Sequence, residues 1–182
     1  KQQILTHLNS TCINCSACPL SKCGRKQVVF GHGNADARLM FIGEGPGRDE
    51  DVQGYPFVGR AGQLLTKIIA AMGFERSQVY ISNVVKCRPP ENRTPLPEES
   101  GICKNILLFK EIEIIKPAII CTLGVTATQA LLGEGVFMSS VRGKFVEFRN
   151  IPVLPTYHPA YLLRNPAAKR TVWEDVKKIM AL

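Results

Sequence analysis

Short apolar runs alternate with longer amphipathic segments along this chain, and this alternation limits the possible folds more than any other feature. Four of the runs are bounded by turn-forming residues, which is typical of buried strands. Strands that alternate with helices form a parallel sheet covered by helices on both faces. We therefore expect an α/β fold, a three-layer α/β/α sandwich around a central, mainly parallel four-stranded sheet. The expected strands are 38–43, 79–84, 118–123 and 152–156.

The segments between these runs carry apolar residues at helical spacing. Leu65, Ile68, Ile69 and Met72 share one face of the first such segment, and Pro117 ends the second. The expected helices are 62–72, 97–115, 125–132 and 166–180. Segment 141–149 is expected to form a strand or one part of a hairpin.

The length of 182 residues predicts one domain, 1–182, with a sizeable core. An apolar content of 45% and the absence of low-complexity tracts argue against disorder. No stretch approaches the length of a membrane span, and the N-terminal residues lack the pattern of a secretory signal. We expect a monomeric cytoplasmic protein with no membrane partner. The net charge of +8 favours a polyanionic partner such as nucleic acid, although basic charge also serves solubility.

A glycine-rich turn, GEGPG at 43–47, follows the first expected strand directly. Glycine allows a sharp turn and lets a ligand approach main-chain N–H groups closely. Ligands of open α/β sheets bind at the carboxyl ends of the strands. The carboxylate of Glu44 and the ring of Phe57 are therefore candidates for a binding site at this end of the sheet, although core packing is the commoner fate of a Phe.

Seven cysteines, an odd number without an export signal, argue against a disulfide framework and for metal or cluster ligation. Four of them lie near the N-terminus: Cys12, Cys15, Cys18 and Cys23. Cys87 follows the second expected strand and Cys103 lies on a helix, whereas Cys121, inside an apolar run, is expected to be a buried apolar residue. Four thiolates suit either an iron–sulfur cluster or zinc, but the wide spacing of Cys87 and Cys103 weakens zinc.

Four motifs in order complete the pattern: GEGPG at 43–47, PFVG at 56–59, SNVVKCRPP at 82–90 and HPAYLLR at 158–164. Together they resemble the family 4 uracil-DNA glycosylases, the iron–sulfur type, and the resemblance covers nearly the whole chain. It implies a DNA repair enzyme that flips uracil out of single- or double-stranded DNA. The enzyme would hydrolyse the N-glycosidic bond and leave an abasic site.

The resemblance also implies a [4Fe–4S] cluster held by Cys15, Cys18, Cys87 and Cys103. Pro19 and Leu20 after Cys18 agree with the family pattern. Cys12 forms a second Cys-x-x-Cys with Cys15, so the first pair of ligands has an alternative. We expect the cluster to be architectural, because it would tie the N-terminal segment to a central loop and helix.

Three residues carry uracil recognition by resemblance. Phe57 stacks on the base, and Asn83 pairs with its edge, since an amide can donate to one uracil atom and accept from N3–H. His158 donates to O2 and stabilises the developing anion. From the residues alone, Asn83 is equally suited to capping a turn.

Glu44 is expected to position the attacking water or to stabilise the cationic sugar. The backbone of Gly45 is the alternative, because many other uracil glycosylases carry Asp or Asn where this chain has Gly45. Glu50 is expected near uracil C5, where it excludes the methyl group of thymine, and the main chain of Gly43 is expected to approach the base.

Leu162 and Leu163 are either a wedge for the base stack or core residues of a short helix. Arg164 and Arg142 are candidate phosphate contacts. One alternative function is a non-catalytic, metal- or cluster-bearing nucleic-acid-binding module, which would need no set such as Glu44, Asn83 and His158. Another is the related cross-linking type, whose inserted basic loop carries a histidine that segment 140–144 lacks; we therefore expect turnover.

Overall fold

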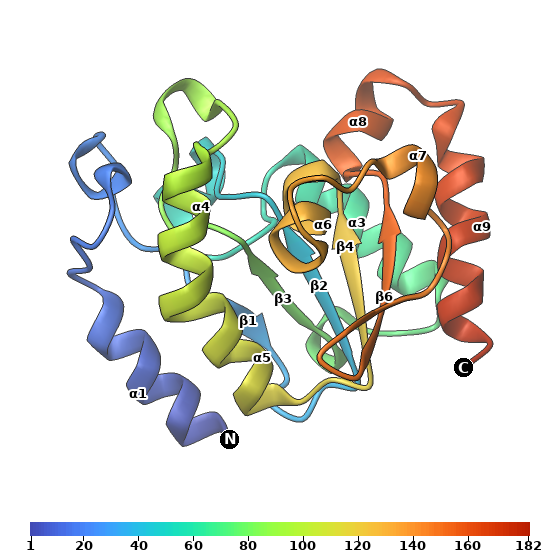
Figure 1. Cartoon of the computed structure of the whole chain (residues 1–182), viewed down its shortest axis with the longest axis horizontal. Helices are drawn as coiled ribbons and strands as arrows, with labels where there is room; N and C mark the ends of the chain where they lie inside the picture. Colours follow the sequence, from blue (N-terminus) through green and yellow to red (C-terminus); the bar gives the residue numbers. More distant parts are fainter.

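The computed structural model describes residues 1–182 as a six-stranded sheet between two layers of helices (Figure 1). The strand order is β1-β3-β2-β4-β6-β5. The six strands are β1 (His32–Gly33), β2 (Leu39–Gly43), β3 (Tyr80–Asn83), β4 (Ile119–Leu123), β5 (Val146–Phe148) and β6 (Ile151–Thr156).

The four expected strands form the parallel centre of the sheet, with β2 paired to β3 and β4, and β4 paired to β6. The expectation of four strands is corrected by two short antiparallel edge strands, β1 beside β3 and β5 beside β6. β5 lies within 141–149, where a hairpin piece was expected. Arg149 and Asn150 join it to β6 with φ of 50° and 64°, the left-handed conformation that a two-residue hairpin turn requires.

The helices are α1 (Gln2–Cys12), α2 (Arg48–Gln53), α3 (Arg60–Ala71), α4 (Pro97–Cys103), α5 (Phe109–Ile115), α6 (Val125–Leu132), α7 (Met138–Val141), α8 (Pro159–Arg164) and α9 (Ala168–Met180). The four expected helices are among them with differences at several ends, whereas α1, α2 and α7 were not expected. The expected helix 97–115 is a continuous helical run whose middle, Lys104–Leu108, is a π-helix. None of the helices is long and apolar enough to cross a membrane.

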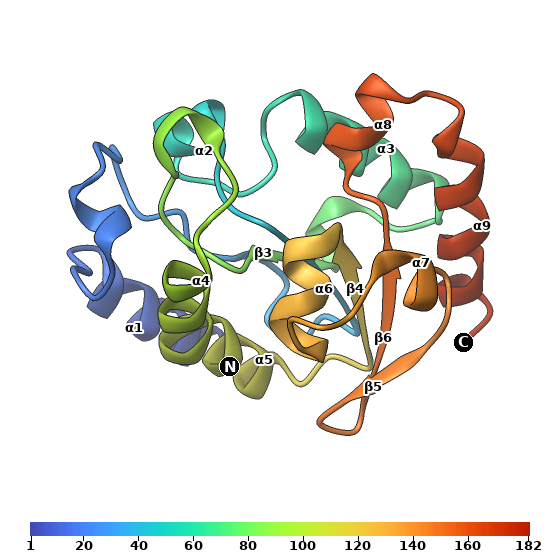
Figure 2. The same ribbon diagram turned by 45° about the horizontal axis from the view of Figure 1, so that its top comes forward.

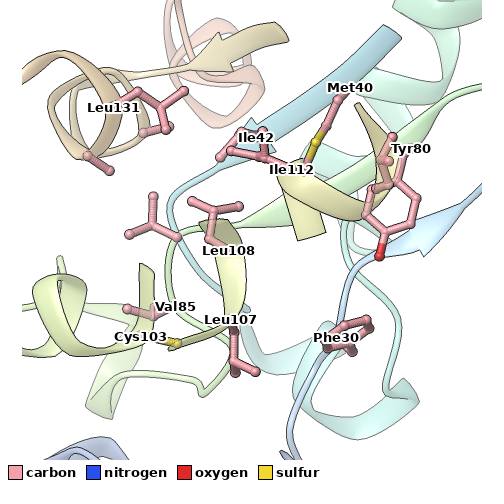
Figure 3. Close-up of a cluster of buried hydrophobic side chains, with 14 of the residues drawn as sticks. Phe30, Met40, Ile42, Tyr80, Val85, Cys103, Leu107, Leu108, Ile112 and Leu131 are labelled. Atoms are coloured by element: carbon pink, nitrogen blue, oxygen red, sulfur yellow. The ribbon is translucent and has the colours of Figure 1, made fainter. Parts of the chain in front are cut away.

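Alternation along the strands divides the core in two, because neighbouring strand residues point to opposite faces. Met40 and Ile42 of β2 pack under α1, α4–α5 and α6, and Figure 3 shows them facing Leu108 and Ile112. Leu39 and Phe41 of β2 pack against α3, α8 and α9 on the other face. The three layers predicted from the sequence are therefore present, and both core clusters hold the carboxyl ends of the strands rigidly in place.

Candidate active site

A cleft of about 260 Å³ opens at the carboxyl ends of the parallel strands. Its walls come from the glycine turn after β2, the end of β3, the loop before α3 and the start of α8. Helix α8 lies near the top of Figures 1 and 2. Glu44, Gly45, Phe57, Asn83 and His158 all line it. Residues separated by up to 114 positions in the sequence thus meet where the strand ends predicted a site.

Gly43 lets Phe57 and Asn83 lie together at the base of this cleft. A Cβ at Gly43 would lie 2.5 Å from Asn83 Oδ1 and 2.6 Å from Cε2 of the Phe57 ring, closer than side chains approach. Glycine is therefore required here for close approach rather than for its backbone conformation. The expected grouping of these three residues is found in the structure.

The side chain of Asn83 has a buried oxygen without a hydrogen-bond partner. The residue is 2% exposed, and its Oδ1 has no hydrogen-bond partner in the protein. Leaving a buried acceptor unsatisfied costs about 1–3 kcal/mol, and most buried polar atoms are paired. An unpaired acceptor at the wall of a cleft is suited to receiving a donor from a ligand.

Phe57 is held in a costly conformation. Its φ of 54° lies in the left-handed region, which is rare for a bulky residue. The carbonyl of Pro56 accepts a hydrogen bond from Arg76, and Gly62 at the start of α3 presses against the backbone of Phe57 so closely that no Cβ fits. The ring stacks on His158 with centroids 5.5 Å apart and an angle of 30° between the planes. The loop therefore presents a fixed aromatic platform beside the imidazole.

His158 is neutral and has a defined tautomer. Burial and, to a smaller extent, the positive charge of Arg164 together lower the pKa of His158 to about 4. Its Nδ1 accepts the N–H of Ala160 at 3.1 Å, in the first turn of α8. Since Nδ1 is an acceptor in a neutral ring, the proton is on Nε2, which makes Nε2–H a donor available to a ligand.

Glu44 is attached to the protein at two points. Its carbonyl accepts the N–H of Val85 at 3.1 Å, and its Oε2 accepts the hydroxyl of Thr126. The side chain is half-buried at the cleft wall, so a water molecule has access to the carboxylate. Gly45 lies against Val85, where a Cβ would approach Cγ2 of Val85 to 2.6 Å.

Glu50 joins two loops of the cleft. Oε1 accepts the N–H groups of Val58 and Gly59 at 2.9 and 2.8 Å, and Oε2 accepts that of Gly47 at 3.1 Å. These bonds connect the glycine turn to the Phe57 loop, a role that the sequence did not indicate. The expected steric role of Glu50 beside a base stays a prediction.

Of the four residues expected to contact DNA, two are exposed and two are engaged within the protein. Leu162 is 1% exposed and belongs to the core, so its prediction as a wedge is wrong, and its alternative as a core residue of α8 is confirmed. Leu163 is 37% exposed, and Arg164 is exposed at the end of α8. Arg142 donates to both carboxylate oxygens of Asp175 at 2.7 and 2.8 Å, because the fold brings α9 beside it. Contrary to expectation, its charge is not free for a phosphate.

The four cysteines expected as ligands influence one another electrostatically. The pKa of Cys103 is raised to about 12, mainly by burial, with smaller increases from Cys87 and Cys18 that oppose a lowering by Lys86. Burial also raises the pKa of Cys87, with smaller increases from Cys18 and Cys15, while Arg25 lowers it and donates to the Cys87 sulfur at 2.8 Å. Three separate segments thus bring four thiols and one cationic donor together.

The chemistry of this donor set suits an iron–sulfur cluster, because all four cysteines are free thiols and four-thiolate ligation is what such a cluster requires. Cys18, Cys87 and Cys103 are buried. Cys12 is buried and Cys23 exposed, and Cys121 is fully buried in the sheet, as expected.

Sequence reasoning missed Thr126 and Arg76. Each supports a site residue through a contact between distant segments, and a lone Thr or Arg gives no local signal of it. It also missed the buried pair of Lys86 and Glu111, in which Lys86 also donates to the Asn83 carbonyl at 2.8 Å. Lys86 directly precedes Cys87 in the sequence, but nothing there indicated that its side chain would be buried.

Comparison with known proteins identifies the family of the chain. The family model of the uracil DNA glycosylase superfamily matches residues 30–177. The type-4 uracil-DNA glycosylase of Thermotoga maritima is 47% identical over 182 residues, which cover 98% of this chain and 94% of the relative. Those of Saccharolobus solfataricus and Archaeoglobus fulgidus are 46% and 42% identical, over 91% and 92% of this chain and 80% and 87% of theirs. The chain belongs to the type-4 uracil-DNA glycosylases, within the uracil-DNA glycosylase superfamily.

Proposed function

We propose that this protein excises uracil from DNA by hydrolysing the N-glycosidic bond, leaving an abasic site. The observation that carries the proposal is the unpaired Oδ1 of Asn83, which lies in a cleft beside the Phe57 ring and a neutral His158. A base stacked on Phe57 presents its edge to Asn83 and an oxygen to His158. Family membership supplies the substrate class.

Recognition follows from the donor and acceptor order of the base. Uracil offers a donor, N3–H, to Asn83 Oδ1, and an acceptor, O4, to the amide nitrogen. Cytosine presents an acceptor at N3 and a donor at N4, so the same amide would meet two mismatches. A site built to pair with a polar edge discriminates strongly, because its own groups are otherwise left unpaired.

Departure of the base is assisted by His158. When the C1′–N1 bond breaks, the base keeps the bonding electrons and negative charge develops on O2. A neutral Nε2–H aimed at this oxygen strengthens its hydrogen bond as the charge grows, which stabilises the transition state more than the bound substrate. The low pKa of His158 suits this role, since the imidazole acts as a donor without transferring a proton.

The reaction is completed when water adds to the sugar. The water oxygen bonds to C1′ of the cationic sugar as the base departs, and a water proton moves to the Glu44 carboxylate and then to solvent. The anionic uracil takes a proton from solvent after release. Glu44 is suited to this because its carboxylate is anchored at the cleft wall and open to water.

Exposed basic side chains are suited to binding the DNA backbone. A net charge of +8 favours the phosphate backbone, and Arg164 lies exposed at the end of α8, next to half-exposed Leu163. We assign Arg164 to a phosphate and Leu163 to the gap that the flipped base leaves, since apolar side chains stabilise unstacked steps.

We assign a [4Fe–4S] cluster to Cys15, Cys18, Cys87 and Cys103. When bound, it supplies a covalent link between the N-terminal segment, the loop after β3 and the end of α4. The free thiols of this chain agree with a reducing compartment, and we place the protein in the cytoplasm as a monomeric single domain.

The deciding experiment incubates the cluster-loaded protein with an end-labelled duplex that contains one uracil, followed by alkaline cleavage of abasic sites. We expect strand breaks at uracil and none at cytosine or thymine in matched duplexes. The same protein with Asn83→Ala is the control for contaminating glycosylases. A non-catalytic DNA-binding module would retain the duplex in a gel-shift assay and produce no breaks.

A further inference from the structure

Thr126 is bonded to the carboxylate of Glu44, and no motif in the sequence suggested this contact. Its hydroxyl donates to Glu44 Oε2 across 82 positions of the chain. The bond to Val85 fixes only the main chain of Glu44. A glutamate has three rotatable side-chain bonds, so without a second anchor its carboxylate would sample several positions.

The anchor itself is rigid. Thr126 is the second residue of α6, directly after a turn in which Gly124 has a φ of 90°. Gly124 donates to the carbonyl of Thr156 at 2.9 Å, and Thr128 donates its hydroxyl to the carbonyl of Gly124 at 2.8 Å. The position of the Thr126 hydroxyl is therefore determined by β4, β6 and α6 together.

The same turn also touches the opposite side of the cleft. A Cβ at Gly124 would lie 3.1 Å from Cβ of His158, which is a tight approach. The beginning of α6 therefore contacts His158 through Gly124 and Glu44 through Thr126. The N-terminal turn of a helix also favours a nearby carboxylate through its partial positive charge.

We propose that Thr126 is a positioning residue for uracil excision, which orients the Glu44 carboxylate toward the attacking water. The inference rests on the proposed role of Glu44. With Oε2 bonded to Thr126, Oε1 is the oxygen left for water. As the C1′–N1 bond breaks and the base takes the electrons, the water oxygen bonds to C1′ and its proton passes to Oε1. Thr126 itself neither touches the substrate nor exchanges a proton.

The test compares Thr126→Val, which keeps the shape and removes the hydroxyl, with Thr126→Ser, which keeps the hydroxyl. We expect Thr126→Val to lower single-turnover excision by about 10- to 100-fold, the scale of a misplaced reacting group. Affinity for a duplex carrying an uncleavable uracil analogue should stay within about twofold, and Thr126→Ser should restore most of the rate. Thr6→Val on the exposed face of α1 is the matched control and should leave the rate unchanged.

A double-mutant cycle separates this inference from the role of Glu44. If both hold, Glu44→Ala is slow and adding Thr126→Val slows it no further. If Glu44→Ala alone has the wild-type rate, the proposed role of Glu44 fails, and the inference fails with it. If Glu44→Ala is slow but Thr126→Val is not, only the inference about Thr126 is overturned. Equal losses of rate and affinity in Thr126→Val, or no rescue by Thr126→Ser, would show that Thr126 has a merely structural role.

Discussion

Replacing Asn83 by leucine should make the free protein more stable and the enzyme inactive. Leucine has nearly the shape of asparagine but no polar atoms. In the wild type, Asn83 Oδ1 is buried without a partner, which costs about 1–3 kcal/mol. The substitution removes this cost. A gain of 1 kcal/mol raises the melting temperature of a chain of this size by about 2–4 °C, so a rise of a few degrees is expected.

Excision should change in the opposite direction, because Asn83→Leu removes both hydrogen bonds to the edge of the base. Loss of one polar contact to the reacting group in comparable sites costs about 10²–10³-fold, and we expect at least this loss in the single-turnover rate. Urea denaturation and thermal melting of cluster-loaded protein, together with quenched single-turnover assays on one preparation, measure the two effects side by side.

Thr128→Val is the matched control for stability, because it removes a buried polar atom that does have partners. The Thr128 hydroxyl bonds to the carbonyl of Gly124 and to Thr122 at 2.9 Å. Its loss should destabilise the protein by about 1 kcal/mol. If Asn83→Leu destabilises the protein as much as Thr128→Val does, Asn83 Oδ1 is satisfied in the free protein, and the reasoning from an unpaired acceptor is refuted.

Four further predictions concern the other parts of the site. His158→Ala should lower single-turnover excision of uracil by about 10²–10³-fold but that of 5-fluorouracil, a better leaving group, by less; equal defects on both bases would exclude anion stabilisation. Because the pKa of His158 is depressed to about 4, its contribution to folding stability is full above about pH 6.5 and is lost as the pH falls toward 4. Urea denaturation of the wild type should show this loss between about pH 6.5 and 4, and His158→Ala should not. Cys87→Ser should lose the visible absorption and iron of the cluster while Cys121→Ser keeps both, as iron analysis would show. Arg164→Ala should lower the slope of log affinity against log salt by about one, and an unchanged slope would remove Arg164 from the phosphate contacts.

The location of the main site was predictable because several of its residues follow strands, whereas their roles came from the family resemblance. Gly43, Asn83 and His158 each lie at or just after the end of a strand, and parallel strands place their carboxyl ends at one edge of the sheet. The edge strands β1 and β5 were harder to predict, since two or three residues give no measurable alternation.

Contacts between side chains from distant segments were not predictable. Leu162 and Leu163 are neighbours on a helix of six residues, too short for periodicity to show which one faces the core. Arg142 reads as a free basic residue until the fold places Asp175 beside it. Thr126 has no local feature that separates it from any helical threonine. Such contacts depend on how whole helices and strands pack against one another, and no local sequence pattern reports that packing.

The cleft also gathers local features that are unfavourable in the free protein. Phe57 holds a left-handed φ, Asn83 buries an unpaired acceptor, and His158 is desolvated until its pKa falls to about 4. The first two features each cost on the order of 1–3 kcal/mol, and a chain whose sequence served folding alone would have no reason to gather all three at one edge of the sheet. In the proposed complex, uracil donates to the unpaired Asn83 acceptor and accepts from the neutral imidazole, which compensates the last two features, while the strained backbone of Phe57 keeps its ring in place for stacking. Only a base whose edge matches these groups compensates their cost, and this is the physical basis of the proposed specificity.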